Sequence, residues 1–124
     1  MKIPKIPFVN DVLGQLLYVL LTGGECSGYE EISVNASLPV ALNIPEGAVY
    51  ALVVCEADTT HPTKTKVIRY KQLDTENNPP NASIGMPLGE LGVVEIKGTL
   101  SMNAFRAVGI DDGYTHILRV EYYS

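Results

Sequence analysis

The chain of 124 residues has no tryptophan, two phenylalanines, two cysteines and two histidines. Two cysteines do not provide the disulfide framework of a small secreted domain. They also do not combine with His61 and His116 at a recognisable zinc spacing, so both histidines are predicted to lie on the surface or in turns. Nine basic residues stand against 14 acidic ones, giving a net charge of −5. Bulk electrostatic binding of nucleic acid is therefore not expected.

Membrane and catalytic signals are also missing. The apolar run of residues 16–21 is far shorter than the roughly 20 residues that cross a bilayer. Early lysines before this run resemble a signal peptide, but the prolines, Asn10-Asp11 and the lack of a small-residue cleavage site argue against one. No nucleophile elbow, phosphate loop or HExxH stretch occurs. We therefore expect no membrane contact, no enzyme activity, no catalytic residue, no cofactor and no metal.

The composition is that of one compact domain. Hydrophobic residues make up 46% of the chain and charged residues 19%, and eight prolines with eleven glycines favour many turns over long helices. A chain of this length buries roughly two thirds of its unfolded surface, so a core can form without a metal or a disulfide.

The most apolar stretch follows a turn signal, Pro45-Glu46-Gly47, and covers residues 48–57. Its apolar side chains fall on both parities, which predicts a central strand covered on both sides. Cys55 in this stretch is predicted to be a small buried thiol. Cys26 lies in a glycine-rich polar loop, and a disulfide between the two cysteines remains open at this stage.

The remaining chain alternates in short segments separated by turns. Residues 74–83 form the strongest loop signal, and Asp111-Asp112-Gly113 is predicted to be a hairpin turn, with a calcium loop as the weaker alternative. Pro39 marks one segment as an edge strand or a bulge. Further strands are predicted over residues 29–36, 38–44, 67–72, 93–97, 105–110 and 117–122. About eight short strands predict an all-β, single-domain antiparallel β-sandwich of the jelly-roll type.

The N-terminal residues are predicted to differ from the rest. Residues 1–9 contain two X-Pro steps and form an extended arm that is loose or lies across a neighbouring subunit. Residues 10–22 fit a short helix or a buried strand, and the strand is preferred because everything after them is β. The sandwich domain is assigned to residues 10–124. The candidate interface residues in this part of the chain are Ile3, Ile6, Phe8, Leu13 and Leu16.

Tyrosine is the dominant aromatic residue, with seven copies. Tyr50, Tyr70 and Tyr122 fit inward-facing core positions at strand parity. The alternative is that tyrosines form a platform on which the rings of a glycan stack. Its candidate contacts are Tyr29, Tyr114 and Tyr123.

Five segments, taken in order, resemble small virion proteins of tailed bacteriophages. They are residues 44–51 (IPEGAVYA), 67–70 (VIRY), 80–88 (PNASIGMPL), 105–108 (FRAV) and 118–123 (LRVEYY), and residues 10–14 (NDVLG) resemble a recurring opening in that group. One departure is that the Asp-Gly turn expected after the second segment is replaced by a longer loop, which puts any role of that turn in doubt. The motifs are structural, consisting of turns and strand ends.

The resemblance implies a virion component such as a capsid-decoration, head-fibre, tail-associated or connector-associated protein, without enzyme activity. Such a protein is made in the bacterial cytoplasm and resides in the virion. Its expected partners are copies of itself and phage capsid or tail proteins. A glycan-binding module on the surface of a particle or cell, with a role in host attachment, is the alternative from another functional class.

Overall fold

The computed structural model describes residues 25–60 and 63–124. The arm of residues 1–9, the helix or strand of residues 10–22, the interface candidates Ile3 to Leu16 and His61 lie outside the described residues. Seven strands and one short helix are present in the described part. They are β1 (Cys26–Val34), β2 (Tyr50–Glu56), β3 (Val67–Lys71), β4 (Met86–Gly89), β5 (Val93–Lys97), α2 (Thr99–Ala104), β6 (Arg106–Gly109) and β7 (His116–Tyr123).

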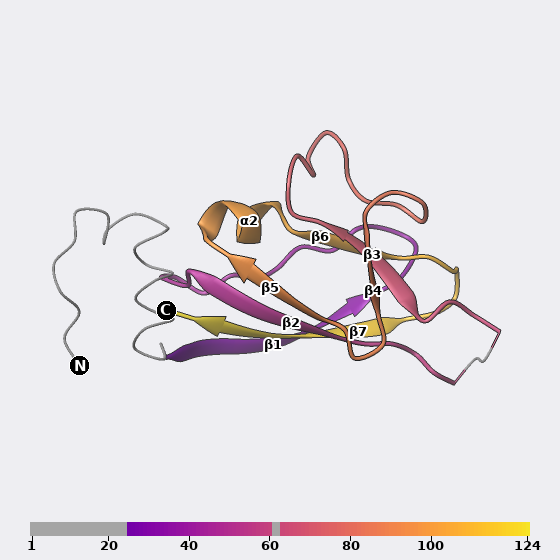
Figure 1. The fold of residues 1–124 in the computed structure, drawn as a ribbon, viewed down its shortest axis with the longest axis horizontal. Coiled ribbons are helices and arrows are strands. Elements are labelled where there is room, and N and C mark those ends of the chain that lie inside the picture. Colours follow the sequence, from indigo (N-terminus) through magenta and orange to yellow (C-terminus); the bar gives the residue numbers. More distant parts are fainter. Residues whose placement is uncertain (1–24, 61–62) are drawn as a thin grey trace, which may run out of the picture.

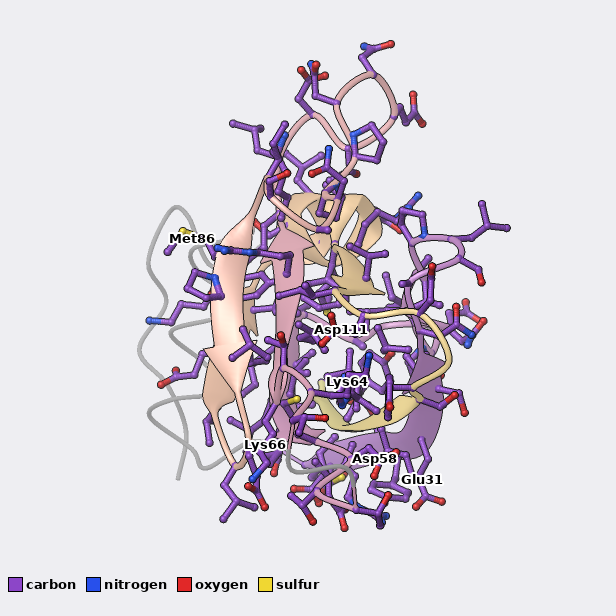
Figure 2. The ribbon with its side chains drawn as sticks, turned by 90° about the vertical axis from the view of Figure 1, so that its right-hand side faces the viewer. Glu31, Asp58, Lys64, Lys66, Met86 and Asp111 are labelled. Carbon is purple, nitrogen blue, oxygen red and sulfur yellow. The ribbon has the colours of Figure 1, made fainter. Side chains whose placement is uncertain are left out.

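The strands form two antiparallel sheets. The four-stranded sheet has the order β1-β7-β2-β5, and the three-stranded sheet has the order β4-β3-β6. Figure 1 shows the long strands β1, β2 and β7 running side by side, with α2 above the end of β5. Figure 2, an end-on view, shows the two sheets as separate layers. The predicted all-β sandwich is confirmed.

An isolated bridge between Val40 and Ala107 adds a rudimentary strand beside β6. Two backbone hydrogen bonds hold it, from Val40 N to Ala107 O at 2.8 Å and from Ala107 N to Val40 O at 3.1 Å. With this bridge the three-stranded sheet gains a fourth position, and the chain passes back and forth between the sheets. We count the strands in chain order, with the Val40 segment as the second of eight. The two sheets then have the orders 1-8-3-6 and 2-7-4-5, which are those of an eight-stranded jelly roll, as the sequence predicted.

The predicted strand over residues 38–44 is wrong in extent, because only Val40 pairs. Proline at position 39 has no N–H to donate, so the ladder cannot extend through it. Leu38 is 74% exposed, whereas Leu42 is buried without belonging to a strand. The alternation of apolar residues here marks side chains that reach the core from an irregular segment.

The core lies between the two sheets. Its β7 contribution is Leu118, Val120 and Tyr122, the three residues predicted to face inward, and all are at most 1% exposed. Tyr70 stacks on Phe105 with ring centroids 5.8 Å apart, so this tyrosine also faces the core as predicted. Cys55 is fully buried, and both cysteines are free, so the disulfide left open above is absent.

Several connections differ from the sequence predictions. The predicted hairpin at Asp111-Asp112-Gly113 instead links β6 to β7, which belong to different sheets. The helix α2 was not predicted, because six residues are too few to show a helical period. The strand β4 was also missed, since Pro87 interrupts its apolar pattern; it is an edge strand, where proline is tolerated.

Candidate interaction surface

The outer face of the four-stranded sheet is the candidate interaction surface. The strands of a jelly roll are lettered B to I in chain order, so β1, β7, β2 and β5 correspond to B, I, D and G, and we call this surface the BIDG face. Strand registers place its outward side chains in rows across β1, β7, β2 and β5. One row contains Cys26, Tyr123, Tyr50 and Lys97; the next contains Tyr29, Glu121, Leu52 and Glu95; the third contains Glu31, Arg119, Val54 and Val93; and the last contains Ser33, Ile117 and Glu56.

The strand β2 crosses the middle of this face, between β7 and β5. Its inward residues Ala51, Val53 and Cys55 are completely buried. Its outward residues Tyr50, Leu52 and Val54 are only half-buried. The prediction that this strand is covered on both sides is therefore wrong for the part of the chain that the structure describes. The prediction that Tyr50 faces inward is wrong as well.

The polar half of the BIDG face is organised around Arg119. Its guanidinium donates hydrogen bonds to the carboxylates of Glu31 and Glu56 and, at 2.8 Å, to the hydroxyl oxygen of Tyr29. The hydrogen bonds to Glu56 and Tyr29, with the charge of Glu31, raise the pKa of Arg119 further above its ordinary value. One cation thus links three strands and neutralises part of the acidic charge. This arrangement fixes the side chains of three strands relative to one another.

Three tyrosines lie together at one end of the same face. The rings of Tyr50 and Tyr123 pack edge to face, with centroids 5.6 Å apart and an interplanar angle of 66°. Tyr29 is one row further along β1 and is 54% exposed. Partial burial and a hydrogen bond with the Glu95 carboxylate raise the pKa of Tyr50 to about 12. The Tyr50 hydroxyl therefore remains a protonated donor at neutral pH.

The structure places two of the three predicted glycan contacts on the BIDG face and the third elsewhere. Tyr29 and Tyr123 share the BIDG face, and Tyr50, which was assigned to the core, joins them. Tyr114 lies in the connection before β7, at the opposite end of the sandwich, where the Lys64 ammonium is 5.3 Å from its ring centroid. The parity of β7 could have placed Tyr123 outward, because it follows the inward Tyr122. The sequence signal for the outward face of β2 was the charged Glu56, which shares the parity of Tyr50.

The apolar part of the face continues past β5 to Leu91. Gly92 N donates to Gly89 O at 2.9 Å, which closes a tight turn with Leu91 inside it. Leu91 has φ 60° and is 70% exposed. A left-handed backbone disfavours leucine by roughly 1–2 kcal/mol, and glycine or asparagine would avoid this cost. Leu91 therefore exposes an apolar side chain at a position where its backbone is strained.

The opposite end of the sandwich contains a buried histidine. His116 is 1% exposed, so the prediction of a surface or turn histidine is wrong for this residue. Its Nδ1 accepts a hydrogen bond from Asp58 N at 2.9 Å, and Asp111 Oδ2 accepts one from Thr65 N at 2.7 Å. Figure 2 shows Asp58, Lys64 and Asp111 gathered at this end. Burial lowers the pKa of His116, although Asp58 and Asp111 oppose this effect. The neutral ring holds the loop after β2 against β7, and the Thr65–Asp111 bond joins this loop to the connection before β7.

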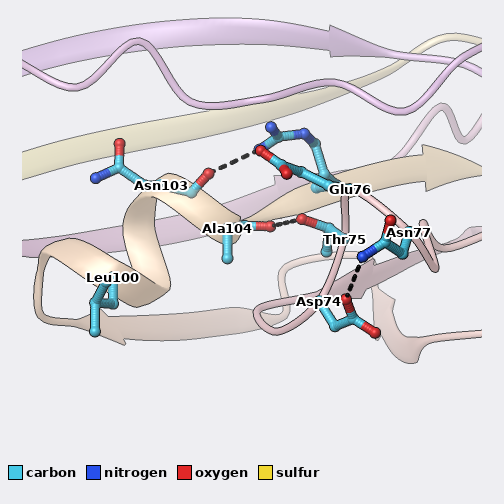
Figure 3. A pocket seen from close by; sticks show the side chains of 8 residues that line it. Asp74, Thr75, Glu76, Asn77, Leu100, Asn103 and Ala104 are labelled. Carbon is cyan, nitrogen blue, oxygen red and sulfur yellow. Dashed lines mark hydrogen bonds between the residues drawn. The ribbon is translucent and has the colours of Figure 1, made fainter.

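A shallow, open pocket of about 260 Å³ lies between α2 and the loop after β3. Figure 3 shows its closed side, where Thr75 donates a hydrogen bond to the Ala104 carbonyl. Arg106 Nη1 donates to the carbonyls of Asn103 and Phe105 at 3.0 and 2.7 Å. The Thr75 bond attaches the loop to the end of α2, and the Arg106 bonds satisfy carbonyls at the same helix end, so these polar groups serve the fold.

Other site classes find little support in the described part of the chain. Residues 25–60 and 63–124 contain no group of three or more histidine, cysteine or acidic residues that could hold a metal ion. Over the same residues, no helix is long and apolar enough to cross a membrane. No family model, no curated protein and no solved structure matches the chain.

Proposed function

We propose that the protein is a non-enzymatic structural component of a tailed-bacteriophage virion, such as a capsid-decoration, head-fibre or tail-associated protein. In this role it assembles with itself or attaches to the particle through the BIDG face. The observation that supports the proposal most is the jelly-roll strand order, an architecture found in viral capsid domains. A fold alone does not fix a function, so the surface has to support the role as well.

The BIDG face supports it through its apolar side chains. Val93 is 57% exposed and lies opposite the half-buried Val54 of β2, and Leu91, two residues before Val93, is 70% exposed. Apolar side chains that adjoin on one face mark interaction sites more often than scattered ones do. The sequence resemblance adds a second, separate line of support, since its segments include residues 44–51, which lead into β2, and residues 118–123, which lie in β7.

Light scattering on the purified full-length protein tests the assembly. We expect species larger than a monomer that dissociate on dilution. Val93→Glu places a charge on the BIDG face and should weaken assembly by about tenfold or more. Leu38→Glu, at a similarly exposed apolar residue outside the face, is the matched control and should leave assembly unchanged. A monomer at every concentration that also fails to sediment with phage particles would contradict the proposal.

A second candidate function is glycan binding on a particle or cell surface. It is favoured by the grouping of Tyr29, Tyr50 and Tyr123 on one face, beside carboxylates that can accept hydrogen bonds from sugar hydroxyls. Jelly rolls also include lectin domains. A glycan array tests it: binding that is lost in Tyr29→Ala and retained in Tyr114→Ala would support a site on the BIDG face, and an array without any binding would exclude this candidate.

A further inference from the structure

We propose that the occupant of the BIDG face is the N-terminal segment, residues 1–22, of a neighbouring copy of the chain. This inference rests on the proposed function, because it names the partner in the proposed self-assembly. The described residues leave the apolar outward side chains of β2 without a covering layer, although Tyr50, Leu52 and Val54 are larger than the inward residues of the same strand.

The electrostatics of the face disfavour the simplest alternative, in which two BIDG faces meet. Four carboxylates and two cations give the face a formal charge of −2; they are Glu31, Glu56, Glu95, Glu121, Arg119 and Lys97. Two such faces would repel each other. By contrast, residues 1–22 contain two lysines and one aspartate, for a formal charge of +1, and they are otherwise apolar or neutral. The segment therefore complements the face in both charge and polarity.

The length of the segment and its attachment point allow it to reach a neighbouring copy, as the proposed self-assembly requires. Glu25 and Ser124 exchange backbone hydrogen bonds of 3.4 and 3.1 Å, so the segment joins the domain at the end of the four-stranded sheet. The eight residues of β7 extend over about 26 Å, whereas 22 extended residues reach roughly 70 Å. The X-Pro steps at Pro4 and Pro7 disfavour a compact helix in the first residues. Such a segment is long enough to reach beyond its own domain.

The test measures the accessibility of the face in the full-length protein. In a Cys26→Ser background, Val93→Cys reports on the BIDG face and Ser83→Cys on an exposed loop. Cys55 is fully buried and should not react. We expect maleimide labelling of Val93→Cys to slow on the order of tenfold between about 1 and 200 µM protein, while Ser83→Cys keeps its rate. Adding Leu16→Asp or Phe8→Asp should restore fast labelling at high concentration.

Each other outcome overturns the inference in a distinguishable way. Oligomers in which Val93→Cys stays fully reactive would refute this contact and leave self-assembly standing. Protection in the dilute monomer would assign the face to the segment of the same chain. Protection that survives Leu16→Asp and Phe8→Asp would identify a different occupant. A protein that is monomeric throughout would refute this inference together with self-assembly.

Discussion

Acidification should destabilise the protein through His116. Because the folded state lowers the pKa of this imidazole below its ordinary value of 6.5, the unfolded chain binds the proton first as the pH falls. Protonation would also remove the Nδ1 acceptor from Asp58 N, at 2.9 Å, and leave a cation in a site that is 1% exposed. Stability should therefore fall as the pH drops below about 6.5.

The size of this effect has an upper limit. One site changes the free energy of unfolding by at most about 1.4 kcal/mol per pH unit, so the loss between pH 7 and 5.5 is at most about 1.3 kcal/mol. For a domain of this size that corresponds to a fall in Tm of roughly 3–6 °C. Asp58 and Asp111 face the ring and attract the proton, which makes the actual loss smaller than this limit.

Thermal and urea unfolding at several pH values, followed by circular dichroism, would measure this loss of stability on acidification. His116→Asn retains an oxygen that can accept the Asp58 N–H, and it cannot be protonated. Its stability should be nearly flat between pH 7 and 5.5, because Asp111, with its lowered pKa, loses its contribution only at a more acidic pH. If the wild type and His116→Asn show the same slope over this range, the assignment of the pH dependence to the buried histidine is wrong.

Three further predictions concern buried polar groups. Tyr122→Phe removes a hydroxyl that donates to Glu30 and should lower the free energy of unfolding by about 1.5–3 kcal/mol in urea titrations; a loss below about 0.5 kcal/mol would refute this role. Burial raises the pKa of Cys55 to about 11, so the folded thiol stays protonated at a pH where the unfolded one ionises. The free energy of unfolding should therefore fall by about 1 kcal/mol or more between pH 9 and 10, and Cys55→Ala should reduce this dependence on pH. Thr75→Val leaves the Ala104 carbonyl without its donor and should cost about 1–2 kcal/mol and speed hydrogen exchange in the loop after β3, whereas Thr75→Ser should behave as the wild type.

The best sequence predictions came from strands that alternate. β5 was predicted with its observed bounds, Val93–Lys97, because Val94 and Ile96 point inward between exposed neighbours. β7 was predicted with its inward residues for the same reason. A period of two distinguishes the buried face from the exposed face directly, and so strands with one covered side can be identified without further information.

The parity of β7 also indicates that His116 is buried. His116 shares the inward parity of Leu118 and Val120, and extending the strand by one residue would have placed the imidazole in the core. The predicted strand of residues 117–122 begins one residue after His116, and so the histidine was predicted to lie on the surface or in a turn. Histidine does not separate core from surface by residue type alone, so only the position of the strand end could decide.

Other features could not be predicted from one sequence. Between Tyr50 and Cys55 the inward and outward residues of β2 are all apolar, so their periodicity does not say which face is covered, and only Glu56 at the end of the strand shares the outward parity as a polar residue. The grouping of Tyr29 with Tyr50 and Tyr123 depends on β1 and β2 both pairing with β7, a long-range arrangement that local patterns do not contain. The Arg119 cluster depends on the same pairing, because its two carboxylates come from different strands.

The energetics of β2 limit what the BIDG face can do as an interface. Covering the remaining exposed area of a half-buried Leu52 or Val54 contributes on the order of 1 kcal/mol for each side chain, at about 25 cal/mol per Å². Together with Tyr50 and Val93, the gain from burial is a few kcal/mol. The loss of translational and rotational freedom when two molecules associate costs roughly 4–15 kcal/mol and so offsets most of this gain. Two isolated copies should therefore bind through this face no more tightly than in the micromolar range, which is why the labelling test extends to about 200 µM protein. On a particle, where neighbours are already held close together, the same contacts act at a high effective concentration and can give stable attachment.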